Sequence, residues 1–136
     1  MRKLAIAVTA AAALLAGPAL QAKPKLTPQQ ELAKLLEGRE PGKPTNCLSS
    51  FDTREMRVLD KTAIVYGRGN TIWVNVPKNA EDLDDDDIMV TKTHGGQLCS
   101  LDIMHTMDRA SHMTTGFISL TDFVPYRRVP KVAKAN

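Results

Sequence analysis

From residue 47 onward, apolar and polar residues alternate in short runs, a pattern typical of β-strands with one buried face. Residues 71–76 show the clearest alternation, with Ile72 and Val74 on one face and Trp73 on the other. Turn-forming sequences at 67–70 and 94–97 separate neighbouring runs. The expected strands are residues 55–60, 62–66, 71–76, 88–93, 98–107, 117–120 and 123–126. Together they predict a mainly β fold, a small antiparallel sandwich or barrel-like domain.

The run 98–107 is the longest expected strand, and its alternation predicts which side chains enter the core. The face expected to point inward carries Cys99, Leu101, Ile103, His105 and Met107. On this face His105 is expected to be a neutral, hydrogen-bonded core histidine. Asp102 lies on the opposite face, so a direct acid–base pair between Asp102 and His105 is not expected.

A short N-terminal helix is predicted ahead of the strands. Thr27 can cap its start, Pro28 suits the first helical position, and Gln30 can complete a capping box. Gly38 is a typical residue for its end. The leucines that share one face are Leu32, Leu35 and Leu36. A helix of about three turns is not stable alone in water, so this face is expected to dock on the domain. Residues 39–46 contain two prolines and a glycine and are expected to form a linker.

The first 22 residues have the order of a secretory signal peptide. Arg2 and Lys3 form a positive head, residues 4–15 carry no charge, and small residues precede Ala22. Cleavage near Ala22 would release a soluble periplasmic or secreted protein without a stable membrane anchor. The alternative is a retained hydrophobic helix, but the apolar run is shorter than the about 20 residues that a spanning helix needs.

The rest of the chain has a length that suits one domain. Charge is distributed unevenly along it. Residues 47–126, the expected disulfide-linked β-rich domain, contain seven basic and twelve acidic residues. The helix and linker of residues 23–46 and an expected basic, flexible tail of residues 127–136 together carry nine basic and three acidic residues. A nucleic-acid-binding domain would present a basic face, so this distribution argues against DNA or RNA as a partner.

The sequence contains two cysteines, Cys47 and Cys99. In an exported protein they are expected to form a disulfide, because compartments outside the cytoplasm are oxidising. Closing a loop of this length would stabilise the domain by about 4 kcal/mol. One alternative is a metal site that combines a cysteine with His94, His105 or His112, although the sequence has no C-x-x-C or H-x-x-x-H spacing. The other is a redox-active pair, whose cysteines are normally close in sequence.

Several segments of the domain resemble those of a family of small secreted proteobacterial proteins that is defined as a domain of unknown function. The segments are Thr45-Asn46-Cys47, residues 70–75, Leu98-Cys99-Ser100-Leu101-Asp102 and residues 116–126. Members typically have four cysteines, of which two match Cys47 and Cys99, and the others would fall near Ala80 and at Ile118. Loss of that second pair implies that Cys47 bonds to Cys99. The resemblance covers about residues 47–126 and implies export, but no activity.

Candidate catalytic groups are scattered through the domain. His94, His105 and His112 could act as bases. The serines that could act as nucleophiles are Ser100, Ser111 and Ser119. No Gly-x-Ser-x-Gly or other acyl-transfer motif accompanies them. A small hydrolase-like enzyme that uses a pocket histidine with an acidic partner is therefore the alternative to a non-catalytic role.

Binding candidates come from the aromatic residues and from the 98–107 run. Trp73 and Tyr66 lie in the expected hairpin and could anchor a ligand or partner, together with Asp102 and His105. A structural interpretation instead places Trp73 inside a sheet that is packed on both faces, under the N-terminal helix. The first interpretation predicts a shallow patch that includes Trp73.

Two clusters of potential ligating side chains suggest two kinds of metal site. Glu81, Asp82 and residues 84–87 form a dense acidic cluster, but a Ca²⁺ loop needs alternating ligands and a glycine, and like charges favour a solvated loop. Three methionines lie close to a histidine in sequence: Met104, Met107 and Met113. Such thioethers could bind Cu(I), although filling an irregular core is the commoner role of methionine.

The sequence therefore predicts an exported, non-catalytic binding or envelope-associated module without a cofactor. A histidine-dependent hydrolase and a copper- or zinc-binding protein are the alternatives. The identity of the ligand or protein partner and the oligomeric state are not indicated.

Overall fold

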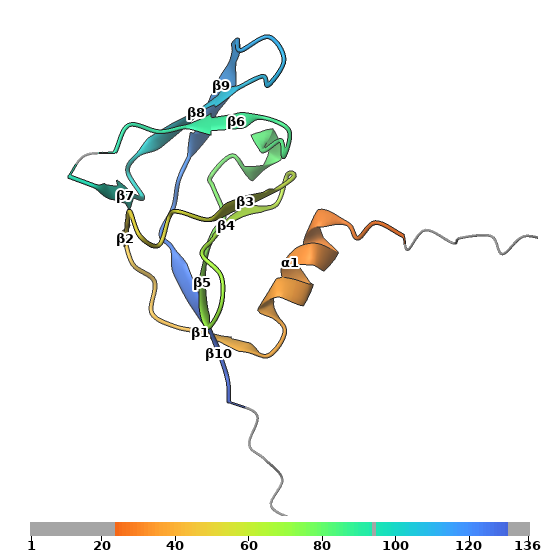
Figure 1. Ribbon diagram of the computed structural model, residues 1–136, viewed down its shortest axis with the longest axis vertical. Coiled ribbons are helices and arrows are strands. Elements are labelled where there is room, and N and C mark those ends of the chain that lie inside the picture. Colours follow the sequence, from red (N-terminus) through yellow and green to blue (C-terminus); the bar gives the residue numbers. More distant parts are fainter. Residues whose placement is uncertain (1–23, 94, 131–136) are drawn as a thin grey trace, which may run out of the picture.

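The computed structural model describes residues 24–93 and 95–130 (Figure 1). The expected signal peptide, His94 and the last part of the expected tail, residues 131–136, lie outside the described residues. The elements are α1 Pro28–Leu36, β1 Arg39–Pro41, β2 Cys47–Ser49, β3 Met56–Leu59, β4 Ala63–Tyr66, β5 Thr71–Asn75, the 3₁₀ turn η1 Ala80–Asp82, β6 Ile88–Val90, β7 Gln97–Cys99, β8 Ile103–Met107, β9 Thr114–Ser119 and β10 Val124–Arg128.

The strands form three antiparallel sheets, with the orders β1-β10-β5-β4-β3, β2-β7 and β6-β8-β9. The predicted mainly β fold with one short N-terminal helix is confirmed, and the described strands do not close into a barrel. In Figure 1 the three-stranded sheet lies at the top, β1 and β10 lie at the bottom, and α1 stands beside the five-stranded sheet. Within the described residues, no helix has the length and apolar character needed to cross a membrane.

Helix α1 begins as the sequence predicts. The side chain of Thr27 accepts a hydrogen bond from Gln30 N (3.2 Å), and Gln30 Oε1 accepts one from Thr27 N (3.0 Å), which completes the capping box. Gly38 follows the helix with a φ of 70°, a conformation that glycine adopts without strain. The predicted leucine face packs against one face of the five-stranded sheet; the buried sheet residues of this cluster are Leu59, Ala63, Val65, Ile72 and Val74.

Strand β4 is buried on both faces. Ala63 and Val65, which are 0% and 4% exposed, point towards α1. Ile64 and Tyr66, which are 0% and 1% exposed, point into a second cluster on the other side of the sheet. That cluster is completed from the two smaller sheets, η1 and the β9–β10 link by Leu48, Leu83, Leu98, Met104, Ile118, Leu120 and Phe123. The five-stranded sheet is therefore the middle layer of the domain.

A buried asparagine joins the middle layer to the β9–β10 link. Asn75 is 0% exposed, donates to Thr121 O (2.6 Å) and accepts from Thr121 N (3.3 Å). The side-chain amide of Asn75 thus takes the place of a backbone pairing where β5 ends. Although it is buried, both its NH₂ group and its oxygen have hydrogen-bond partners.

The disulfide is confirmed. β2 and β7 pair antiparallel with Cys47 directly opposite Cys99, and the two sulfurs are bonded. The described residues contain no free cysteine. The bond ties the start of the β-rich domain to the small sheet that covers one side of the core.

The prediction for residues 98–107 was wrong in its inward face. The run forms two strands, β7 and β8, because residues 100–102 make a turn in which Asp102 Oδ2 accepts from Cys99 N (2.7 Å). The inward side chains are Leu98 in β7 and Met104 and Thr106 in β8, whereas Leu101, Ile103 and His105 are exposed. Both faces of the run carry apolar residues, so the alternation alone does not decide which face is buried. His105 is therefore not a core histidine.

Residues 39–46 were expected to be a linker, but part of this segment belongs to the sheet. Residues 39–41 form β1, which pairs with β10 in the register Arg39↔Arg128. Thr45 forms a further bridge with Phe123. β10 itself continues to Arg128, two residues into the expected tail. A three-residue strand with one proline has too little pattern to be seen in the sequence.

Replacing Met104 with alanine is expected to lower the free energy of unfolding by about 2–5 kcal/mol, because a buried side chain is lost and a cavity remains. Ile103→Ala is the matched control, since Ile103 is 52% exposed, and it should cost about 1 kcal/mol or less. Urea unfolding followed by tryptophan fluorescence measures both changes. A larger loss of unfolding free energy for Ile103→Ala than for Met104→Ala would show that Ile103, and not Met104, points into the core.

Replacing both cysteines with alanine is expected to lower the free energy of unfolding by about 4 kcal/mol, because the unfolded chain regains the freedom that the closed loop removes. Thermal unfolding with and without dithiothreitol tests this. The reductant should lower the melting temperature of the native protein to that of the double variant, and it should leave the melting temperature of the variant unchanged. Equal stability of both proteins in oxidising buffer would contradict the prediction.

Candidate functional site

Six of the seven arginines in the described residues gather around the β4–β5 turn of the middle sheet. They line four neighbouring hollows that share residues with one another. We call this set the arginine end; it consists of Arg39, Arg54, Arg57, Arg68, Arg127 and Arg128. The remaining one, Arg109, lies in the β8–β9 connection, where it pairs with Asp86.

Strand pairing brings these arginines together from distant parts of the sequence. β10 lies between β1 and β5, so that Arg128 is opposite Arg39 and Arg127 is opposite Thr71. Successive side chains of a strand point to opposite faces. Arg127 therefore lies on the face that carries Trp73, and Arg128 lies on the face that α1 covers.

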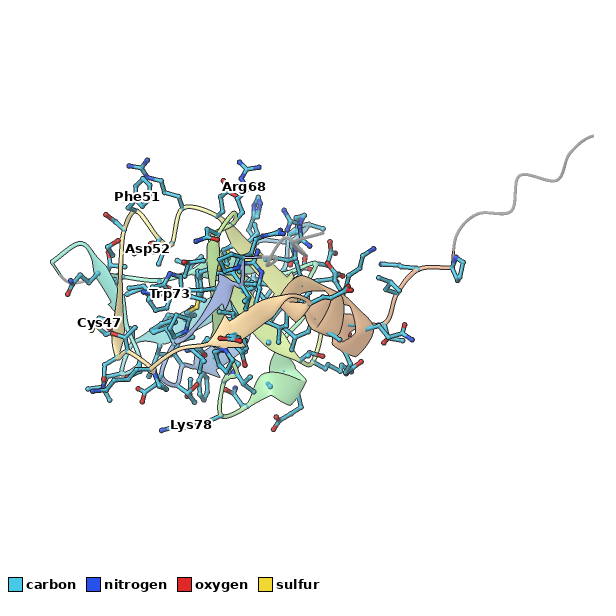
Figure 2. All side chains as sticks on the ribbon, turned by 90° about the horizontal axis from the view of Figure 1, so that it is seen from below. Cys47, Phe51, Asp52, Arg68, Trp73 and Lys78 are labelled. Carbon is cyan, nitrogen blue, oxygen red and sulfur yellow. A yellow bond between two sulfur atoms is a disulfide. The ribbon has the colours of Figure 1, made fainter. Side chains whose placement is uncertain are left out.

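The first hollow, which we call the Trp73 groove, has a volume of about 410 Å³ and lies on the face away from α1. Arg54 stacks on the ring of Phe51, with 5.0 Å between the guanidinium carbon and the ring centroid. Arg68 pairs with Glu55 at 2.6 Å, and both side chains are well exposed. Figure 2 shows Arg68 and Phe51 at the same edge of the molecule, with Trp73 further in. The lining residues are Phe51, Asp52, Arg54, Glu55, Gly67, Arg68, Thr71, Trp73 and Arg127.

The second hollow, which we call the α1 groove, has a volume of about 810 Å³ and runs beside the helix. A smaller hollow of about 390 Å³ continues it towards the β4–β5 turn and shares four of its residues, Leu35, Arg39, Arg57 and Arg128. The α1 groove is lined by Leu26, Glu31, Lys34, Leu35, Glu37, Gly38, Arg39, Arg57, Arg128 and Val129. Both grooves are open to solvent along the arginine end.

Arg39 holds the arginine end together. Its guanidinium donates to three backbone oxygens at short range: Nε to Leu35 O (3.0 Å), Nη1 to Asn70 O (2.8 Å) and Nη2 to Gly69 O (2.7 Å). These bonds join the last turn of α1 to the β4–β5 turn. Desolvation, and then the positive charge of Arg128, lower the pKa of Arg39. Arginine keeps its charge in proteins at neutral pH, so Arg39 stays charged.

The structure separates the aromatic binding candidates. Tyr66 is only 1% exposed, its hydroxyl donates to the Met104 sulfur (3.6 Å), and burial raises the pKa of its phenol. Tyr66 cannot contact a ligand at the surface. Trp73 is half-buried: it packs against the cluster on the side of Tyr66 and also lines the Trp73 groove. It lies opposite the face that α1 covers, so its expected place under the helix was wrong.

Asp102 and His105 do not form a site with each other in the described structure. The carboxylate of Asp102 holds the β7–β8 turn. His105 is exposed on β8 between Val90 and Phe117, its partners in the neighbouring strands. No described hydrogen bond or ion pair joins His105 to a carboxylate or a serine.

Asp108 and Ser111 meet in the β8–β9 connection, but in a capping arrangement. Asp108 Oδ1 accepts from Ser111 N (2.6 Å) and from Ser111 Oγ (2.7 Å). These hydrogen bonds lower the pKa of Asp108, and the nearby His112 contributes less. The serine therefore donates to the carboxylate rather than to a histidine base, which is not the relay that activates a nucleophile.

Metal ligands are not assembled in the part of the chain that the structure describes. Residues 24–93 and 95–130 hold no group of three or more His, Cys, Asp or Glu side chains placed to bind an ion. The acidic residues 84–86 are exposed. Of the methionines, Met104 is buried in the core whereas Met113 is 69% exposed.

No family model, no curated protein and no solved structure matches this chain. The resemblance to the small secreted proteobacterial family therefore stays a prediction. Evidence on function comes from the geometry of the described residues.

The sequence did not predict the arginine end. Its members are separated by up to 89 residues, Arg39 and Arg128 being the outermost, and residues 39–46 and 127–136 were assigned to a linker and a tail. The only local signal was the expected shallow patch around Trp73. Strand pairing, which is a long-range property, supplies the other residues.

Replacing Arg39 with lysine is expected to lower the free energy of unfolding by about 1–3 kcal/mol, because a single ammonium cannot reach three carbonyls that a guanidinium fork joins. Arg128→Lys is the matched control: its one described side-chain hydrogen bond runs from Nε to Gly69 O at 3.3 Å, and the change should cost about 0.5 kcal/mol or less. Urea unfolding measures both. Equal losses would show that Arg39 does not join α1 to the turn.

Proposed function

We propose that this protein is an exported, non-catalytic binding module that holds an anionic ligand at the arginine end. The observation that carries the proposal is the convergence of six guanidinium groups on two open grooves. Guanidinium groups bind carboxylates and phosphates through paired, charge-assisted hydrogen bonds. The half-buried Trp73 and the exposed Phe51 add aromatic surface beside these donors.

The charge of the surrounding domain supports an anionic ligand. Residues 47–126 carry five more acidic than basic residues, yet three arginines and two acidic residues line the Trp73 groove. The Arg127 guanidinium makes no hydrogen bond or ion pair with the described residues, so its N–H groups are available to a ligand. A cationic groove in an acidic domain selects small anions over extended polyanions such as nucleic acids, which need a broad basic face.

Export is supported by two features that are independent of the grooves. The order of residues in the first 22 positions is typical of a signal peptide. The Cys47–Cys99 disulfide suits an oxidising compartment, such as the periplasm or the exterior. The positions of His105 and His112 support a non-catalytic role, because neither residue lines one of the two grooves.

Inorganic tripolyphosphate, a small polyanion, provides the test. The fluorescence of Trp73, the one tryptophan in the chain, is expected to change saturably on titration, and the affinity should fall as salt is added. In the double variant Arg68→Gln/Arg127→Gln the affinity should fall about tenfold or more, because charged hydrogen-bond donors are lost.

Arg109→Gln is the matched control, since it removes an exposed arginine far from the grooves. Its affinity should equal that of the native protein. An unsaturable titration, or an equal loss in Arg109→Gln, would show that the arginine end is not an anion site. A circular dichroism melt of each variant establishes that it is folded.

A further inference from the structure

The α1 groove combines positive charge with exposed apolar surface. Its volume of about 810 Å³ lies within the range of about 300–1,000 Å³ that is typical of small-molecule sites. Arg39 and Arg128 line the groove where α1 ends and β10 passes, whereas Arg57 pairs with Glu31 of the first turn of α1. The apolar residues come from the segment before the helix, from the helix and from the residue after β10. This arrangement favours a ligand with two chemically different parts.

The charged part is formed by Arg39, Arg57 and Arg128. The N–H groups of Arg39 donate to backbone oxygens, and its positive charge lies beside that of Arg128. Arg57 pairs with Glu31 at 2.9 Å, but both side chains are partly exposed, so an anion can compete for the guanidinium. An anionic group beside Arg128 would relieve the repulsion between the neighbouring charges of Arg128 and Arg39.

The apolar part is formed by Leu26, Leu35 and Val129. Leu26 precedes the helix and Val129 follows β10, and each is 43% exposed. Leu35 is half-buried on the helix face that lines the groove. Covering such side chains removes apolar surface from water, which only a ligand with an apolar portion can do.

We propose that the α1 groove binds one molecule of an anionic amphiphile, with a phosphate or carboxylate head between Arg57 and Arg128 and a single acyl chain along Leu26, Leu35 and Val129. The proposal rests on the function proposed above and names the class of ligand. The lipids of a cell envelope are the source of such molecules, which agrees with the predicted export. The groove is lined by four basic residues and only two acidic ones, Glu31 and Glu37, so an anionic head is favoured over a cationic one, and this charge preference is a separate test.

Monomeric dodecyl phosphate, below its micellar concentration, is the probe, and isothermal titration calorimetry of the oxidised protein is the measurement. We expect one site per chain and binding about tenfold or more tighter than that of inorganic phosphate, because the acyl chain buries apolar surface. Dodecyltrimethylammonium should not bind. Two double variants, Arg57→Gln/Arg128→Gln and Leu26→Asn/Val129→Asn, should each weaken dodecyl phosphate about tenfold.

Arg109→Gln and Ile103→Asn are the controls, since each changes an exposed residue outside the groove; both should bind dodecyl phosphate as the native protein does. If inorganic phosphate binds as tightly as dodecyl phosphate, the amphiphile is excluded while anion binding at the arginine end survives. If the loss of arginines weakens the binding of neither phosphate nor tripolyphosphate, the proposed function itself is wrong. Binding to phosphatidylglycerol vesicles without binding of the monomer would overturn the single-molecule site in favour of membrane-surface docking.

Discussion

The burial of both faces of β4 is the constraint on which the rest of the structure depends. Its four side chains, Ala63, Ile64, Val65 and Tyr66, are each less than 5% exposed. A sheet with two apolar faces needs a cover on each, and the chain supplies α1 on one side and the two smaller sheets on the other. Because α1 is too short to be stable alone, its place depends on the leucine face and on the bonds of Arg39.

Local signals predicted the elements well, and long-range geometry decided the rest. The capping box at Thr27 and the alternation of residues 71–76 act within a few positions, so the sequence alone reveals them. The run 98–107 carries apolar residues on both faces, so its alternation alone did not reveal that Leu98, Met104 and Thr106 point inward. The pairing of Arg39 with Arg128 joins the two ends of the domain, and no local pattern encodes it.

The layout of charge follows from the same architecture. Asp85 of the acidic cluster lies near the start of α1, where it shares a hollow with Thr27 and Pro28, and Arg39 binds a carbonyl at the end of the helix. Negative charge at the N-terminus and positive charge at the C-terminus both suit the helix dipole. The arginines thus serve the fold and the grooves together: Arg39 holds the helix in place, and Arg57 and Arg128 face the space that this placement leaves open.

One of the two edges of the five-stranded sheet bears on how partners can be recognised. That edge is β1, which has only three residues, two of them charged, and ends at Pro41, which has no N–H group. Short, charged, proline-containing edges do not template an additional strand. The protein is thereby protected on this side from edge-to-edge aggregation, and extended peptides gain no main-chain ladder there. Recognition next to this edge must be made by side chains.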